Sequence, residues 1–148
     1  MSRSKLTLSE FLPYQLSITS NAVSDLIARA YRGRFALKVP EWRLMAVLGE
    51  VASATQRELV EATAMDKVTV NRASKALEDR GLIGRAPNAA DGRSHHLALT
   101  NTGRELYEQI VPLALSVEAE LEKILGGGEA KALEKMLAQL RARVIELE

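Results

Sequence analysis

The chain has 148 residues, of which 47% are hydrophobic, so its length and composition allow one domain with a sizeable core. It contains no cysteine, which excludes disulfides, a thiolate nucleophile, thiol redox sensing and finger-type zinc sites. The net charge of +1 is unevenly spread, because the N-terminal part is mildly basic and the C-terminal part is acidic. With neither a signal-peptide pattern nor an apolar run of about 18 residues, we expect a cytoplasmic protein.

Helical periodicity predicts two helices in the first third of the chain. The first spans about residues 9–34, with apolar side chains on one face and Pro13 in or near its opening turn. The second begins at Pro40 and ends near Val51, because proline suits the first helical turn and a turn of small residues follows.

Two shorter helices are predicted next. Thr55 and Glu58 form the Ser/Thr-x-x-Glu capping pattern, which predicts a helix to Thr63. Asp66 can cap a further helix over residues 67–80, which stops at Gly81. Two short helices joined by a turn of four or five residues are typical of a helix-turn-helix.

The second helix of this pair has an apolar and a polar face. Val70, Ala73 and Leu77 share one side and can pack inward. The other side chains include amide, hydroxyl and cationic groups that can meet base edges in the major groove of DNA: Lys67, Thr69, Asn71, Arg72 and Lys75. The same pattern also fits the solvated face of an ordinary helix pair.

Residues 82–87 and 95–99 are predicted strands, separated by a turn signal at Asp91-Gly92. Arg93 lies at the tip of this hairpin, where its cation can enter a minor groove or contact phosphate, and Asp91 could pair with it. The neighbouring cations are Arg80, Arg85 and Arg104. A helix-turn-helix followed by such a hairpin is a winged helix, although a plain hairpin with a solvated arginine is the alternative.

Two more helices are predicted at residues 101–125 and 129–147. Pro112 should bend or split the first of them, and the three glycines at 126–128 should end it. Together with the first helix of the chain they carry more apolar surface than one small winged helix can cover. An excess of this kind favours a dimer.

The segment from Arg57 to Arg104 resembles the MarR family of bacterial transcription regulators. The matching pieces are Thr-Val-x-Arg at 69–72, Leu-Glu-x-x-Gly-Leu at 77–82, Asp-x-Arg-Ser at 91–94 and Leu-x-Leu-Thr-x-x-Gly-Arg at 97–104. Pro-Glu-Trp-Arg at 40–43 is similar to the start of the family's preceding helix. The flanking helices match in layout, so the resemblance covers nearly the whole chain.

The resemblance implies a mainly α fold with a small β-hairpin wing, in which a winged helix-turn-helix is flanked by N- and C-terminal dimerisation helices. Residues 1–36 and 101–148 would form the dimerisation region, and residues 37–100 the DNA-binding region, within one intertwined domain. The function implied is a homodimeric, sequence-specific regulator, most often a repressor in this family. Its partner would be double-stranded DNA with a pseudo-palindromic operator, whose half-sites lie about 10 bp apart.

The resemblance also assigns residues by motif position. Lys67, Thr69, Asn71 and Arg72 would contact the major groove, with Lys75 further along the same helix. Arg93 would enter the minor groove, supported by Asp91, while Arg85 would support the wing or contact the DNA backbone. Ser94 and His95 complete the expected wing contacts.

Family members often respond to small aromatic or anionic molecules held between the dimer helices and the DNA-binding lobe. Tyr14, Tyr31, Arg34 and Trp42 could line such a cavity, and each fits a core or interface position equally well. A ligand there would change DNA affinity by changing the distance between the two DNA-reading helices.

We expect neither a cofactor nor a metal. His95 and His96 would point to opposite faces of a strand and could not easily share one ion, although their protonation would add positive charge to the wing. The chain shows no catalytic constellation and no phosphate-binding glycine loop, so we expect no enzyme. The main alternative is a winged helix used for protein–protein interaction without DNA binding, and a second is a ligand-binding or catalytic helical protein.

Overall fold

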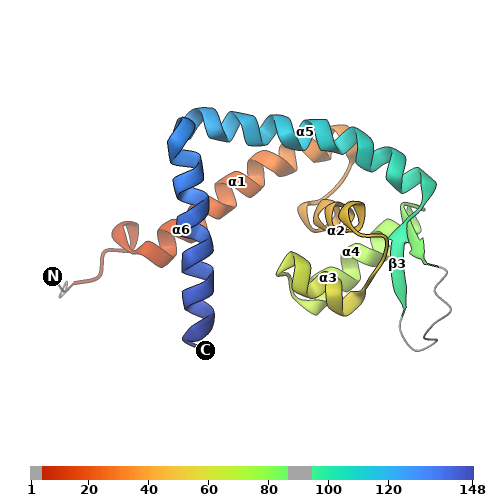
Figure 1. Ribbon diagram of the computed structural model, residues 1–148, viewed down its shortest axis with the longest axis horizontal. Helices are drawn as coiled ribbons and strands as arrows, with labels where there is room; N and C mark the ends of the chain where they lie inside the picture. Colours follow the sequence, from red (N-terminus) through yellow and green to blue (C-terminus); the bar gives the residue numbers. More distant parts are fainter. Residues whose placement is uncertain (1–4, 87–94) are drawn as a thin grey trace. The chain divides into compact units, whose positions relative to one another are not determined.

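The computed structural model describes residues 5–86 and 95–148, which form helices and a small antiparallel sheet (Figure 1). The chain divides into two compact units, Met1–Ile110 and Val111–Glu148. The first unit contains every strand of the described residues and the helices that pack on them. The mainly α fold with a small β wing, expected from the sequence, is therefore confirmed.

The N-terminal helices begin and end with recognisable caps. A 3-10 turn, η1 (Leu8–Glu10), precedes α1 (Leu12–Phe35), which has Pro13 in its first turn. Helix α1 begins at Leu12, later than the expected residue 9, and it ends at Ala36, a residue in the left-handed region with φ 55°. Helix α2 (Val39–Glu50) begins with Pro40 in its first turn, and the buried Glu41 accepts a hydrogen bond from the backbone N–H of Lys38 at 3.1 Å.

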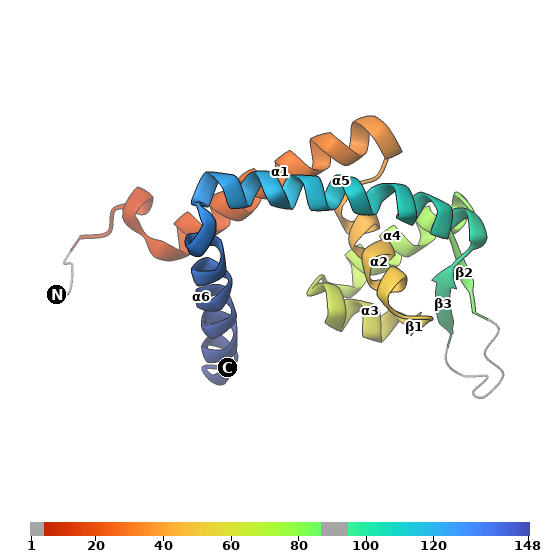
Figure 2. The ribbon, with the colours of Figure 1, turned by 45° about the horizontal axis from the view of Figure 1, so that its top comes forward.

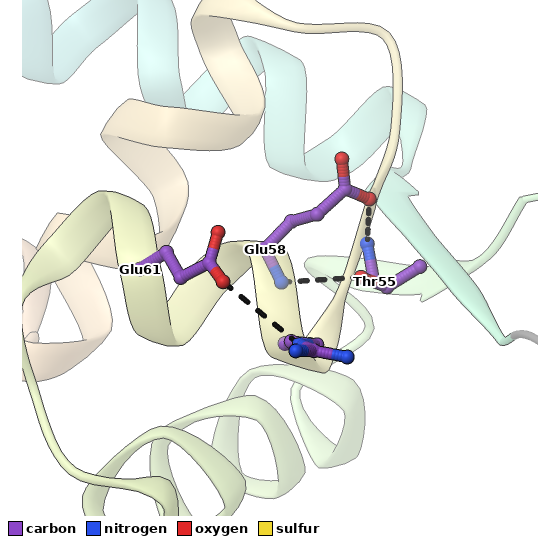
Figure 3. Close-up of polar contacts among 4 residues, drawn as sticks. Thr55, Glu58 and Glu61 are labelled. Carbon is purple, nitrogen blue, oxygen red and sulfur yellow. Dashed lines mark hydrogen bonds and ion pairs between the residues drawn. The ribbon is translucent and has the colours of Figure 1, made fainter.

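Helix α3 (Gln56–Thr63) begins with the capping pair that its sequence predicts. The Glu58 N–H donates to the Thr55 hydroxyl oxygen at 3.1 Å, and the Thr55 N–H donates to the Glu58 carboxylate at 3.0 Å (Figure 3). Ala64, with φ 55°, ends α3 and turns the chain into α4 (Lys67–Asp79), whose N-cap is Asp66. The helix-turn-helix is thus present at the expected residues.

The sheet has three strands where the sequence predicted two. Its strands are β1 (Ala54–Thr55), β2 (Ile83–Arg85) and β3 (His96–Leu99), all antiparallel, in the order β1-β3-β2 (Figure 2). Leu97 pairs with Ala54 on one side and Arg85 on the other. The expected pairing of the two wing strands is present, and the short segment before α3, which the sequence did not indicate as a strand, adds an edge strand. The strands are also shorter than the expected 82–87 and 95–99.

A tight corner joins β3 to α5 (Asn101–Leu125). The Thr100 N–H donates to the Leu82 carbonyl at 3.1 Å, and the Thr100 hydroxyl donates to the Gly81 carbonyl at 2.7 Å. The same hydroxyl oxygen accepts the Gly103 N–H at 3.0 Å, which caps α5. A Cβ at Gly103 would collide with the Leu82 carbonyl oxygen. The Thr-x-x-Gly motif is therefore explained by its backbone contacts.

The core of the first unit lies where α2, α3 and α4 meet the sheet. The helices pack on one another and α4 also contacts β2 (Figure 2). Close helix packing is visible at Gly49 of α2, where an added Cβ would meet the ring of Tyr107 of α5. The large apolar side chains buried there are Leu44, Met45, Leu48, Leu59, Val70, Leu77 and Ile110. Burial of these side chains is the main stabilising contribution to the winged helix.

Helix α5 is continuous through Pro112, so of the two expected outcomes, a bend or a split, the split does not occur. An internal proline removes only its own N–H from the helical ladder, and the remaining hydrogen bonds can continue. Gly126, with φ 90°, separates α5 from α6 (Gly127–Glu146), while the other two glycines lie in the first turn of α6. The described part of the chain buries no side chain of α6, and none of the described helices is long and apolar enough to cross a membrane.

Candidate nucleic-acid interface

Helix α4 presents a continuous exposed stripe. Val68 is followed by Asn71, Arg72 and Lys75 at intervals of three, four and seven residues, and all four are exposed. The opposite side, formed by Val70, Ala73, Ser74 and Leu77, is buried. The predicted inward face is therefore confirmed, with Ser74 as an additional member.

Of the five residues expected to read the major groove, four are exposed. They are Lys67, Asn71, Arg72 and Lys75. Thr69 is half-buried at the margin, and its hydroxyl donates to the Asp66 carboxylate at 2.8 Å. Its hydroxyl proton is therefore already used within the protein, and only its oxygen remains as an acceptor.

Asp66 holds the first turn of α4. Its carboxylate accepts the Thr69 N–H at 2.8 Å as well as the Thr69 hydroxyl. These two hydrogen bonds hold the pKa of the Asp66 carboxyl below its usual value. A negative charge at the N-terminus of α4 also complements the helix dipole. The cap thus fixes the end of α4 at which the exposed stripe begins.

A buried polar contact sets α3 against α4. The Gln56 side-chain amide donates to the Ser74 hydroxyl oxygen at 2.8 Å, and Ser74 is only 1% exposed. Ser74 was missed in the sequence because a polar residue at an inward position gives no apolar signal. Since a buried hydroxyl needs a partner, this bond favours one particular packing of the helix-turn-helix.

Two of the five residues expected to contact DNA from the wing lie in the described part of the chain. Arg85 is exposed at the end of β2, and His95 is exposed just before β3. Asp91, Arg93 and Ser94 lie outside the described residues, so their contacts with DNA stay predictions. The Ala86 N–H donates to the His96 carbonyl at 2.7 Å, which continues the pairing of the two strands one step beyond β2.

His96 lies beside the capping pair of α3. It pairs with Thr55 in the sheet register and is half-buried. The hydrogen bonds from Thr55 chiefly hold the pKa of Glu58 below its usual value, and the nearby His96 lowers it further. Among the residues that the structure describes, no three acidic or histidine side chains gather as metal ligands would.

Arg80 serves a purpose that the sequence did not indicate. Its guanidinium donates to the backbone carbonyls of Phe35, at 3.1 Å, and Ala36, at 3.0 Å. The end of α4 is thereby tied to the C-terminus of α1, where carbonyls lack helical partners. Arg80, grouped with the wing cations in the sequence, therefore belongs to the junction between these two helices.

The four candidate ligand residues do not form one cluster. Tyr31 is 1% exposed, with its ring centroid 5.0 Å from that of Trp42, and burial raises the pKa of its phenol. The Arg34 guanidinium lies 5.6 Å from the centroid of the Phe35 ring. Tyr14 is near the other end of α1, about 25 Å from Tyr31 along the helix. The rings of Tyr31 and Trp42 are therefore in contact. Arg34 lies nearby, because it precedes Phe35, whose ring neighbours that of Tyr31. Tyr14 lies apart from these residues.

A capped helix-turn-helix with an exposed polar and cationic stripe, joined to a small antiparallel sheet, defines a winged-helix protein of the type that reads nucleic acid. Residues 37–94 match the model of the MarR family. Over these residues the chain is similar to the MarR family, and its fold is that of MarR-family transcriptional regulators of known structure.

Individual relatives show the same similarity. The transcriptional regulator HosA of Escherichia coli is 29% identical over 105 residues, which cover 71% of this chain and 76% of HosA. A MarR/EmrR family regulator from Acinetobacter sp. ADP1 superposes with a TM-score of 0.87 at 26% identity, over 95% of this chain and 99% of that one. The transcriptional repressor CouR, solved with a 23-mer DNA duplex, has a TM-score of 0.81 at 27% identity, over 93% and 99% of the two chains.

Proposed function

We propose that this protein is a homodimeric, sequence-specific DNA-binding regulator that acts as a repressor. The observation that carries the proposal is the exposed stripe of α4, where Asn71, Arg72 and Lys75 extend from a helix that Asp66 and Ser74 hold in place. An α-helix of this kind fits the major groove, and amide and guanidinium groups can form paired hydrogen bonds with adenine and guanine. The likeness to CouR, a repressor solved with DNA, supports it.

The wing supplies the second contact in this proposal. Arg85 and His95 lie on or beside its strands, and Asp91, Arg93 and Ser94 belong to the connecting segment. We assign Arg93 to the minor groove with Asp91 as its support, and Arg85, Ser94 and His95 to the phosphate backbone. Lys67 and Thr69 contact DNA at the margins of the α4 stripe.

The dimer is inferred from apolar side chains that the described part of the chain leaves exposed. One group lies in η1 and the first turns of α1, and includes Leu8, Leu12 and Ile18. A second lies along α6, where Leu133, Leu140 and Val144 follow one another at spacings of seven and four residues. A second copy of the chain would cover both groups, with residues 1–36 and 101–148 as the dimerisation region and 37–100 as the DNA-binding region.

A small aromatic or anionic effector completes the proposal. Arg34 offers a cation, Trp42 offers aromatic surface, and Tyr31 supports Trp42 from the core, whereas Tyr14 lies too far along α1 to join them within the same protomer. The effector acts by binding more tightly to a dimer whose two α4 helices no longer match successive major grooves. If every compound that binds the protein leaves its DNA affinity unchanged, this part of the proposal is wrong.

Selection from a pool of random DNA duplexes, at near-physiological salt, tests the main proposal. We expect enrichment of an inverted repeat with half-sites about 10 bp apart, since a two-fold dimer places two α4 helices one helical turn apart. The mass of the folded protein in solution, measured in parallel, should be that of a dimer. A folded dimer that enriches no sequence would favour the alternative, a winged helix used for protein–protein interaction.

A further inference from the structure

Val68 is an apolar side chain in the middle of a polar surface. It is 64% exposed, although the described part of residues 37–99 leaves only one other large apolar side chain exposed, Val51 at 42%. It lies in the first turn of α4, and Asn71, Arg72 and Lys75 follow it at intervals of three, four and seven residues. Val68 therefore lies on the same stripe as the proposed base-reading side chains.

The position of Val68 on this stripe is central. Helical geometry places it nearly opposite Leu77 and Val70, the buried side of α4, whereas Lys67 and Thr69 are turned about 100° to either side. An α-helix that lies in the major groove with Asn71 and Arg72 facing the bases therefore brings Val68 to the bases too.

The major groove offers one apolar group, the C5 methyl of thymine. A β-branched side chain suits contact with it, because valine in a helix has essentially one rotamer and loses little freedom on binding. Contact between the two would remove apolar surface of both from water. In the unbound protein, the exposure of this apolar side chain to water is unfavourable, and Val68 does not contribute to the buried core.

We propose that Val68 is a specificity-determining residue that contacts the methyl group of one thymine in each half-site. The inference rests on the proposed DNA-binding function and extends it, because it names an apolar contact beside the hydrogen-bonding ones. Cytosine and uracil lack this methyl, so the contact favours an A·T pair at that position.

Replacement of single thymines by deoxyuridine tests the contact, since it removes the methyl and leaves the hydrogen-bonding edge intact. In the sequence selected by the protein, we expect one thymine per half-site whose replacement weakens binding about fourfold, which is the effect of burying one carbon-sized apolar group. Replacement in both half-sites should weaken binding about fifteenfold. Val68→Ala should bind the thymine and deoxyuridine duplexes almost equally. Val51→Ala is the matched control, and should discriminate as the parent protein does.

The outcomes separate this inference from the function on which it rests. Two results would overturn the role of Val68 alone. The protein could select an inverted repeat but bind equally well with deoxyuridine at every position, or the selected half-site could hold no A·T pair. A Val68→Ala variant that discriminates as strongly as the parent would overturn that role as well. A folded protein that selects no sequence overturns the DNA-binding proposal and the thymine contact with it.

Discussion

Asn71 and Lys75 lie one helical turn apart on the exposed stripe of α4, but their side chains can recognise different things. An asparagine amide can form two hydrogen bonds with adenine, whereas a lysine ammonium is a point charge that suits phosphate. We expect Asn71→Ala to lose about 1–3 kcal/mol on the selected operator and to relax one base position. Lys75→Ala should weaken binding to all duplexes and lower the salt slope by about 1.

Binding titrations at several salt concentrations, on the selected duplex and on a scrambled one, measure both effects. If the two variants and the parent behave identically, the assignment of this stripe to DNA is wrong.

Gly103 is a residue at which even a methyl group is excluded. A Cβ there would meet the Leu82 carbonyl oxygen, a backbone atom that cannot turn away. We expect Gly103→Ala to lower the free energy of unfolding by about 1–3 kcal/mol, the usual cost of overpacking. Urea denaturation measures the loss. Gly33→Ala is the control, because nothing lies within 4 Å of a Cβ there and alanine should be neutral or stabilising within helix α1.

Asp66 links the stability of α4 to pH. Because hydrogen bonds from Thr69 lower the pKa of the folded carboxyl below its ordinary value of 3.8, ionisation favours the folded state. This stabilisation is complete above pH 3.8 and is lost as pH falls through the lower, folded value. Thermal melts should therefore show a gap between the parent and Asp66→Ala near neutral pH that narrows below pH 3.8. A gap of constant size down to pH 2 would contradict the role of ionisation. Asp66→Asn keeps the oxygen acceptor but does not ionise, so the difference in melting temperature between Asp66→Asn and Asp66→Ala should depend little on pH in this range.

At the scale of elements, the junction of α1 and α4 depends on one side chain. The Arg80 guanidinium reaches two carbonyls at the end of α1, a geometry that the single ammonium of lysine cannot reproduce. We expect Arg80→Ala to lower the free energy of unfolding by about 1–3 kcal/mol, as for hydrogen bonds to charged groups. Arg80→Lys should recover less than half of this loss.

Chemical denaturation measures the free energy of unfolding of these variants, and Arg57→Ala is the control. Arg57 and Glu61 form an exposed pair 3.8 Å apart, worth about 0–1 kcal/mol at most (Figure 3). An Arg80→Ala variant as stable as Arg57→Ala would mean that the junction does not depend on the guanidinium.

Local signals in the sequence predicted most of the elements. The caps at Thr55 and Asp66, the prolines at 13 and 40 and the stop at Gly81 depend on neighbouring residues, so a pattern can reveal them. Strand β1 could not be predicted, because two residues show no periodicity and pair with β3 more than 40 positions away. Arg80 was assigned to the wrong neighbours for the same reason, since its partners are 44 and 45 residues earlier.

The fold is confirmed, whereas the DNA-contacting residues stay predictions. The polar members of the α4 stripe follow from helical spacing, but Val68 was omitted because sequence patterns assign apolar residues to cores. Thr69 remains in the proposed site, but Asp66 holds its hydroxyl proton, so only its oxygen is left to accept a hydrogen bond. Exposure and hydrogen bonding decide these two positions, and neither can be read from spacing alone.

At the scale of the whole molecule, α6 provides a direct test of the dimer. Leu140 belongs to its exposed apolar series, whereas Ala142 is turned by about 160° around the same helix. We expect Leu140→Glu to convert the dimer to monomer at micromolar concentration, and to abolish tight operator binding, because a buried carboxylate would lose its hydration. Ala142→Glu adds the same charge on the other face and should leave both unchanged.

Sedimentation measures the mass of each variant, and circular dichroism checks that α-helix is retained. A Leu140→Glu protein that remains dimeric would exclude this face of α6 from the interface.

The corner at Thr100 also limits which changes of length the chain can accept. One residue separates β3 from α5, and its N–H and hydroxyl are both engaged with the segment that leads into β2. A single inserted residue would rotate all of α5 by about 100° about its axis, turning Gly103 away from Leu82 and Ile110 away from the core. Relatives that keep this architecture should therefore vary in length elsewhere, and the interval from the central strand to this glycine should be invariant among them.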